Sequence, residues 1–277
     1  MSGDLSNWYL EASSRYAARV REELDARWQA MSIDLSKREV NEVTGALLAR
    51  QCALAIGIAE NTGLWNPNLG PLVLRAMADV HITLAWILLK PEERSRQYIL
   101  HGLGQEKLLL EHLKSKGVDD DSTRAMEAWI DSQQFTWLTE VNVGSWSDLP
   151  VREMADEAGL LDFYRLRYQP LSTASHSMWN QVARANLRVC TNPLHRYHRV
   201  PDVKAFPPDY HCWDAAASML ADTFALLDSK LAIAVDVPSA ADELDRGLED
   251  YARRRKAESS HSDEEPPGSE TSTEPQS

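Results

Sequence analysis

The sequence predicts an all-α protein, a single multi-helix domain of about eight or nine helices followed by a disordered acidic tail. Three observations predict this fold class. Apolar residues recur at helical spacing through most of the chain. No segment shows the alternation of apolar and polar residues that is typical of strands. Gly, Pro and Asn separate the helical segments at intervals. The expected helical domain covers residues 1–256 and the tail covers residues 257–277.

The first three helices are delimited by their apolar patterns and by the residues at their ends. Residues 4–30 carry one apolar stripe at helical spacing. Ser36-Lys-Arg-Glu39 has the sequence of a capping box, so a long helix is expected after it. Asn61-Thr-Gly63 then ends that helix. Residues 72–89 are apolar on almost every side, which predicts a central, buried helix.

The later helices follow from the positions of proline, glycine and aspartate. Pro91-Glu92-Glu93 places a proline and two acids in a first turn, where both are favoured. Pro170 is expected to interrupt the helical structure and so to separate two helices. Residues 193–208 are predicted to form a long loop. The helices expected after residue 90 cover residues 91–116, 119–140, 151–158, 160–168, 171–188, 209–235 and 239–256.

Charge and composition restrict the classes of function. The net charge is −13, and the tail contributes six acidic residues without any Lys or Arg. A globally basic surface for nucleic acid is therefore absent, although a local basic groove remains open. After residue 256, Ser, Glu, Pro and Thr dominate and aromatic residues are missing, which is typical of disorder.

The cysteines and the apolar segments indicate a cytoplasmic protein. Cys52, Cys190 and Cys212 are odd in number and far apart, which fits a reducing compartment better than a disulfide scaffold. The first residues have neither a basic nor an apolar leader pattern. The most apolar run, residues 76–89, is too short to span a bilayer, so no membrane association is expected.

Two pairs of polar residues lie one helical turn apart in segments that look buried. Arg75 and Asp79 form either an internal ion pair or a cleft that holds a polar ligand or phosphate. Ser172 and His176 form either a hydrogen-bonded pair between helices or a nucleophile and its base. The chain has no Gly-x-Ser-x-Gly elbow, which disfavours a serine nucleophile. Trp179 is expected to continue the buried stripe of this segment. Most of the tryptophans are expected to anchor the core.

Several metal-ligating residue types crowd the long loop and the start of the helix that follows it. Their spacing matches no established metal motif. His-Glu-x-x-His is absent from the chain, and Glu-x-x-His occurs once, at Glu258 to His261, away from this loop. We therefore expect a polar connector here, with no metal and no cofactor. The residues concerned are His195, His198, Asp202, Asp209, His211, Cys212 and Asp214.

Short motifs between about residues 40 and 190 resemble a widespread bacterial family that is catalogued only as a domain of unknown function. The family pattern has an Arg-x-x-x-(Asp or Glu) helix, a Pro-Glu-Glu helix start and a Tyr-x-x-x-Ser-x-x-x-His segment. The matching residues here are Arg75 and Asp79, Pro91 to Glu93, and Tyr168, Ser172 and His176.

That family is distantly similar to the HEPN (higher eukaryotes and prokaryotes nucleotide-binding) helical domains. HEPN domains occur among toxin and phage-defence proteins, and many are metal-independent ribonucleases that work as dimers. Their Arg-x(4–6)-His motif has a counterpart in Arg96 and His101, whereas His176 has no arginine at that spacing.

The resemblance implies two classes of function. The first is a cytoplasmic bacterial binding or interaction module linked to phage defence or stress response, with a polar centre of Arg75, Asp79, Tyr168, Ser172 and His176. The alternative is a HEPN-like metal-independent ribonuclease. Whether the protein is an enzyme stays open, as do a homodimer and an RNA or protein partner. If the protein is an enzyme, the candidates for its catalytic residues are His176, Ser172, Arg96 and His101.

Overall fold

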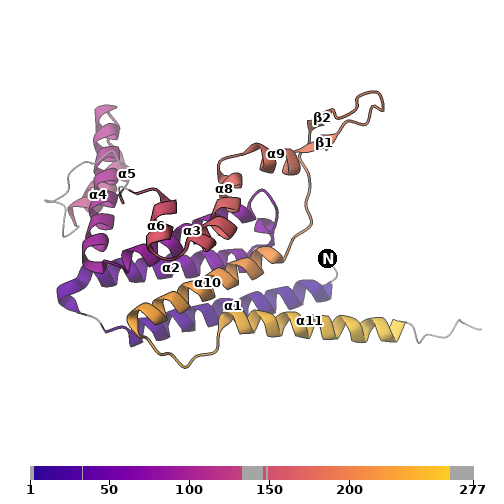
Figure 1. The fold of residues 1–277 in the computed structure, drawn as a ribbon, viewed down its shortest axis with the longest axis horizontal. Coiled ribbons are helices and arrows are strands. Elements are labelled where there is room, and N and C mark those ends of the chain that lie inside the picture. The colour runs from indigo at the N-terminus through magenta and orange to yellow at the C-terminus, as the bar shows by residue number, and fades with distance from the viewer. Residues whose placement is uncertain (1–2, 33, 133–145, 148, 263–277) are drawn as a thin grey trace, which may run out of the picture.

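The computed structural model describes residues 3–32, 34–132, 146–147 and 149–262. Within them the chain is mostly helical, which confirms the all-α prediction (Figure 1). The α-helices are α1 (Gly3–Ala30), α2 (Arg38–Glu60), α3 (Gly70–Ile87), α4 (Pro91–Ser115), α5 (Asp121–Asp131), α6 (Val151–Glu157), α7 (Leu161–Phe163), α8 (Gln169–Ser175), α9 (Trp179–Ala185), α10 (His211–Leu231) and α11 (Ala240–Ser262).

Helices α2 and α3 form the centre of the molecule. Helix α2 packs against α1, α3, α4 and α10, and α3 also packs against α6, α8 and α10. Helix α11 lies along α1 and contacts α10, which closes one side of the bundle (Figure 1). Helices α4 and α5 project at one end, whereas α9 and a small hairpin project at the other (Figure 1). The central position of α3 follows from its apolar surface, as the sequence predicts.

An aromatic cluster joins the first helix to α2 and α10. The Tyr9 hydroxyl donates to the Ala59 carbonyl oxygen at 2.8 Å, which satisfies its polar end inside the core. The Tyr9 ring meets Trp65 edge-on, with ring centroids 5.4 Å apart. Tyr16 meets Trp213 in the same way at 5.4 Å. These aromatic side chains lie in the core, as expected for most of the tryptophans.

The start of α2 differs from the expected capping box. Asp34, two residues earlier, accepts from the Ser36 backbone N–H at 2.9 Å and from its hydroxyl at 2.6 Å. A 3₁₀ turn (Leu35–Lys37) therefore precedes the helix, and Ser36 lies within that turn. Aspartate is as good a cap as serine, so the earlier residue took the role.

The segment after residue 160 departs most from the prediction, because the helical structure continues through Pro170. A π-helical turn (Tyr164–Tyr168) precedes it, and Pro170 lies in the first turn of α8. A π turn displaces the carbonyl that a proline ring would otherwise clash with. The helix ends instead at Ser175, and Ser177 adopts a left-handed φ of 48°.

A two-stranded antiparallel hairpin replaces the end of the predicted helix 171–188 and part of the predicted loop. Strand β1 (Leu187–Val189) pairs with β2 (Arg199–Pro201). Each strand has three residues, too few to show the alternation that identifies strands in a sequence. The sequence does not predict this small sheet, which leaves the all-α class unchanged, and the described part contains more helical segments than eight or nine.

Two predicted boundaries meet the limits of the described residues. Helix α11 runs to Ser262, six residues past the expected end of the domain at 256. The remaining tail, 263–277, lies outside the described residues, as does the predicted end of the fifth helix at 133–140. Among the described helices, α2 is long and apolar enough to cross a membrane by those two criteria, with 50% of its most apolar window buried. A core helix meets the same criteria.

A buried ion cluster fastens α1 to α10 and α11. Arg27 donates two hydrogen bonds to the Asp228 carboxylate, at 3.0 and 2.9 Å, and one to Glu23 at 3.2 Å. The second carboxylate oxygen of Glu23 accepts from the Ala240 backbone N–H at 2.7 Å, at the first residue of α11. Glu23 therefore caps α11 while it neutralises Arg27.

Arg27→Met should lower the free energy of unfolding by about 3–5 kcal/mol, because it leaves the Glu23 and Asp228 carboxylates without their cation in a largely buried site. Urea denaturation measures the loss. Arg38→Met is the matched control, since the Arg38–Glu42 pair is more than half exposed on both sides; it should change stability by less than about 1 kcal/mol. Equal losses in the two variants would contradict this role for Arg27.

Thr223 connects three central helices through its hydroxyl. It donates to the Met219 carbonyl oxygen at 2.7 Å, so its single proton is used within α10. Gln51 Nε2 donates to the same hydroxyl oxygen at 3.0 Å. His81 Nδ1 lies 3.0 Å from it and must also be a donor, which places a ring proton on Nδ1. Burial lowers the pKa of His81 to about 4.

The lowered pKa of His81 should make the protein less stable in mild acid. Between pH 6.5 and about 4 the unfolded histidine is protonated and the folded one is not, so stability falls as pH falls through this window. His81→Asn keeps an N–H donor but cannot titrate. It should remove up to about 1.4 kcal/mol per pH unit from the slope of stability against pH. His112→Asn, at an exposed position, is the control, and an unchanged slope in His81→Asn would contradict the assignment.

Candidate functional site

Arg75 is the centre of a polar cluster that joins α3 to the segment after residue 160. Its side chain is 13% exposed. Nε donates to Ser172 Oγ at 2.8 Å, one terminal nitrogen donates to Asp79 Oδ2, and the other donates to the Tyr168 hydroxyl oxygen. The guanidinium carbon also lies 3.4 Å from the centroid of the Tyr168 ring. We call Arg75, Asp79, Tyr168 and Ser172 the polar centre.

Local geometry explains why these four side chains meet. Arg75 and Asp79 are four residues apart on α3 and therefore share a face. Tyr168 ends the π-helical turn and Ser172 lies one turn further along, so Tyr168 faces α3 from that turn and Ser172 faces it from α8. The Ser172 hydroxyl accepts from Arg75 and donates its own proton to the Tyr168 carbonyl oxygen at 3.0 Å. Ser172 is thus engaged as a connector and has no described base to activate it as a nucleophile.

The electrostatics of the polar centre are those of a neutralised ion pair at the edge of the core. Partial burial raises the pKa of the Asp79 carboxyl, against the opposing effects of the Arg75 charge and of hydrogen bonds from Tyr168 and Arg75. Burial, with the nearby Asp79 charge, raises the pKa of Tyr168. The Asp79 side chain remains 44% exposed, whereas Arg75 is largely covered. The centre therefore offers an acceptor to solvent, while three Arg75 nitrogens are already bound.

His176 does not join the polar centre, contrary to the expectation of five residues in one site. Helix α8 ends at Ser175, and the chain turns away through the left-handed Ser177. The His176 side chain is exposed, and no hydrogen bond connects it to Arg75 or Asp79 among the described residues. Trp179 is 72% exposed, so the predicted buried stripe also ends here.

The second pair of catalytic candidates lies on one continuous helix. Arg96 and His101 are five residues apart on α4, which places them about 140° apart around the helix axis. The Arg96 side chain is exposed, whereas His101 is half-buried and its Nδ1 has no hydrogen-bond partner among the described residues. The two side chains therefore leave the helix on different faces.

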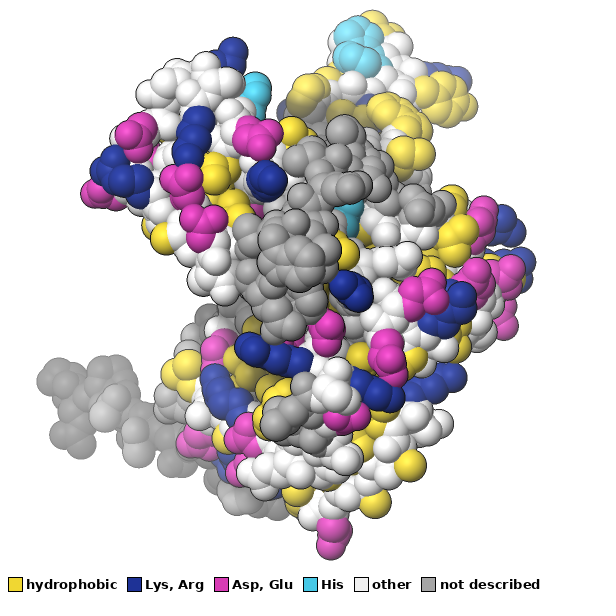
Figure 2. All heavy atoms as spheres, turned by 90° about the vertical axis from the view of Figure 1, so that its left-hand side faces the viewer, with side chains coloured by type: hydrophobic (Ala, Val, Ile, Leu, Met, Phe, Trp, Pro, Cys, Tyr) yellow, Lys and Arg dark blue, Asp and Glu magenta, His cyan; other side chains and the backbone are white. Residues whose placement is uncertain are grey.

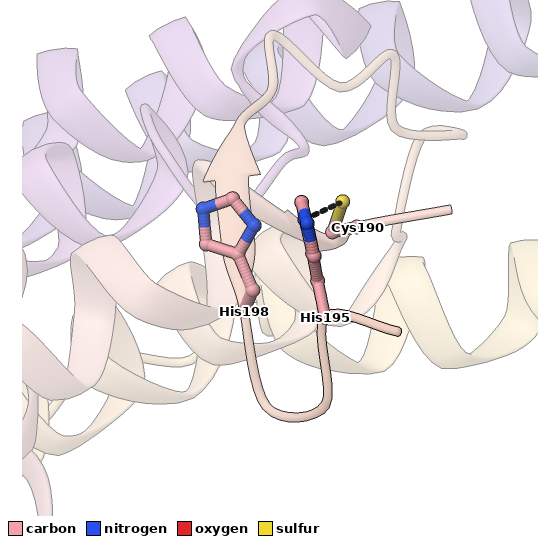
Figure 3. Close-up of side chains that lie close together, drawn as sticks. All are labelled: Cys190, His195 and His198. Carbon is pink, nitrogen blue, oxygen red and sulfur yellow. Dashed lines mark hydrogen bonds between the residues drawn. The ribbon is translucent and has the colours of Figure 1, made fainter. Parts of the chain in front are cut away.

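The structure divides the metal-ligating residues of the long loop into two groups. Asp209 Oδ1 accepts from the His211 backbone N–H at 3.1 Å at the start of α10, and Cys212 packs against Gly70. His195 and His198 lie instead on the hairpin, beside Cys190 (Figure 3). Sequence reasoning missed Cys190, although the turn residues that follow it are a usable hairpin signal.

The fold and the site together define an all-α protein with a polar centre between α3 and α8. The chain belongs to the family of unknown function DUF5677, which matches residues 41–191. The match runs from α2 into the hairpin and includes the whole polar centre. It confirms the predicted resemblance at the level of a domain of unknown function. No curated protein and no solved structure matches the chain.

Arg75→Met should lower the free energy of unfolding by about 1–3 kcal/mol, because it leaves partly buried Asp79 and Tyr168 without their donor. Combined with Ser172→Ala it should be non-additive by more than about 0.5 kcal/mol, since the two side chains are in contact. Denaturant unfolding of both single variants and the double variant measures the coupling. His176→Ala is the control for Ser172→Ala and should be additive with Arg75→Met; strict additivity of Ser172→Ala would contradict a shared centre.

Proposed function

We propose that the protein is an interaction module that binds a protein partner through exposed apolar side chains, which the polar centre holds in place. One observation carries this proposal. Within the described residues, every large hydrophobic side chain that is more than two thirds exposed lies between residues 166 and 203. These side chains are Leu166, Trp179, Val189, Leu194, Tyr197 and Val203.

The distribution of apolar side chains differs between the two ends of the molecule. Figure 2 shows hydrophobic and histidine side chains together on the projecting lobe at the upper right, whereas the lobe at the upper left is mainly charged. Single exposed hydrophobic residues are ordinary on a protein surface, but a concentration of them in one segment indicates an interaction surface. Trp179 follows the half-exposed Met178, and both residue types are enriched at the centres of interfaces.

The polar centre supports this surface by fixing the segment that carries it. Arg75 holds Tyr168 and Ser172 against α3, and α9 follows α8 after a short turn. Helix α9 is fastened further by Gln181, whose Nε2 donates to the Pro67 carbonyl oxygen at 2.5 Å. A surface that is ordered before binding loses less conformational entropy when a partner binds. The role of Arg75 in this proposal is therefore to position, and it is not required to touch a ligand.

The cellular setting is part of the same proposal. The resemblance to a bacterial family with a distant similarity to HEPN domains supports a bacterial protein linked to phage defence or stress response. Free Cys52, Cys190 and Cys212 fit a reducing cytoplasm. The ribonuclease alternative takes second place, because Arg96 and His101 lie on different faces of α4 and the Ser172 proton is bound to a backbone carbonyl.

Photo-cross-linking in living cells tests the surface directly. p-Benzoylphenylalanine at position 179 should give a discrete higher-mass adduct after irradiation, because the side chain lies in the proposed interface. The matched control is position 111, where the exposed Glu111 lies on α4, at the other end of the molecule. An adduct of twice the chain mass would identify a second copy as the partner. Adducts of equal yield at both positions, or at neither, would contradict the proposal.

The ribonuclease alternative has its own experiment. Purified protein incubated with total RNA in EDTA should leave the RNA intact. Cleavage that disappears in His101→Ala, with His112→Ala as the control on the same helix, would favour the alternative instead.

A further inference from the structure

We propose that the β1–β2 hairpin binds one zinc ion through Cys190 Sγ and one ring nitrogen each from His195 and His198. The fourth coordination position would be open to water or to a partner's side chain. The sequence predicts no metal in this loop, because the candidate ligands from His195 to Asp214 match no established spacing and Cys190 is not among them. The hairpin changes that interpretation, because it brings together residues that the spacing alone does not.

The backbone of the hairpin places Cys190 opposite His198. In the antiparallel register Val189 lies opposite Arg199, and one step further the Cys190 N–H donates to the His198 carbonyl oxygen at 2.9 Å. The loop then folds His195 back toward the same side, since the His198 N–H donates to the His195 carbonyl oxygen at 3.2 Å. Figure 3 shows the Cys190 sulfur beside the His195 ring, with the His198 ring on the other side of His195.

The ligand atoms are close to the spacing that a tetrahedral zinc site requires. Cys190 Sγ lies 3.7 Å from His195 Nδ1, and one ligand atom from each of the three residues lies within 4.8 Å of the others. Zinc–sulfur and zinc–nitrogen bond lengths imply ligand–ligand separations of about 3.3–3.6 Å in a tetrahedron. The widest separation is at most 4.8 Å, so it must shrink by up to about 1.5 Å, which rotations of the exposed histidine side chains can supply.

The donor set selects the class of metal. A thiolate with two imidazoles suits zinc, whereas magnesium and calcium require oxygen ligands. Binding releases the Cys190 thiol proton to solvent. It also leaves the ring proton of His195 on Nε2, which lies 3.2 Å from the side-chain amide of Asn192. The oxygen of that amide accepts from the Leu194 backbone N–H at 3.0 Å, so its nitrogen faces Nε2 and must move aside when Nε2 carries the proton.

The hairpin also has a structural need for such a site. Each of its strands has only three residues. Leu194 and Tyr197 in its loop are almost fully exposed, so they contribute no apolar core that would stabilise the hairpin. Tyr197 adopts a left-handed φ of 62°, which is unfavourable for a residue with a side chain. A metal that crosses the hairpin offsets such costs, as in small zinc-stabilised domains. This inference is independent of the proposed function, since a metal site at the hairpin requires no partner.

The test uses the full-length chain without a histidine tag, stripped with EDTA and dialysed. Cobalt(II) should bind with one-to-one stoichiometry and give a thiolate-to-cobalt charge-transfer band together with the strong visible bands of four-coordinate cobalt. One equivalent of zinc should abolish both. Cys190→Ser should eliminate the charge-transfer band, and His195→Ala or His198→Ala should weaken zinc binding by more than about 100-fold, beyond the usual effect of an outer-shell change.

Matched controls separate this site from adventitious binding. Cys212→Ser and His211→Ala change the same residue types at the start of α10 and should leave stoichiometry and spectrum unchanged. Circular dichroism of each variant should match the wild type, because His195 and His198 are exposed and the helices do not depend on them. Absence of one-to-one binding, or binding that survives in Cys190→Ser and in both histidine variants, would overturn the proposal.

Discussion

The guanidinium of Arg75 determines where the π-helical turn and α8 lie, in the second half of the region that matches the family. Arginine cannot lose its charge in a protein, so a mostly buried helix that carries one must provide acceptors beside it. Asp79 supplies one from the same helix, and the segment after residue 160 supplies Tyr168 and Ser172. Burial of α3 therefore also determines where the π-helical turn and α8 lie, and everything that follows α8 starts from that position.

Two other largely buried arginines in the described part of the chain repeat the same solution. Arg27 lies over the Phe224 ring at 4.0 Å, and Arg94 lies over the Trp86 ring at 3.6 Å. Each guanidinium also binds a carboxylate from a distant part of the chain, at 2.9 Å for Arg27 and 2.8 Å for Arg94. A guanidinium is planar and weakly hydrated, so it can stack on a ring while its edge binds acceptors. The bundle is thus fastened by three arginines at points where the apolar core reaches its edge.

Sequence patterns could predict the long helices and most of the polar centre because both follow from spacing along one helix. The i,i+4 relation of Arg75 to Asp79 requires no knowledge of the rest of the fold. The path around Pro170 does require it, since the π-helical turn is stabilised by contacts with α3 that no local pattern encodes. The exposure of His176 depends in turn on the left-handed residue that follows it. Cys190 was missed for a related reason, because strands of three residues leave no pattern to place it opposite a histidine.

The family match ends at residue 191, between Cys190 and the two histidines of the hairpin. The polar centre therefore lies wholly inside the region that defines the family, whereas two of the three proposed zinc ligands lie outside it. The matched region therefore covers the scaffold that positions α8 and α9, whereas the loop that carries His195 and His198 lies beyond it. Family membership alone therefore does not determine the specificity of this chain.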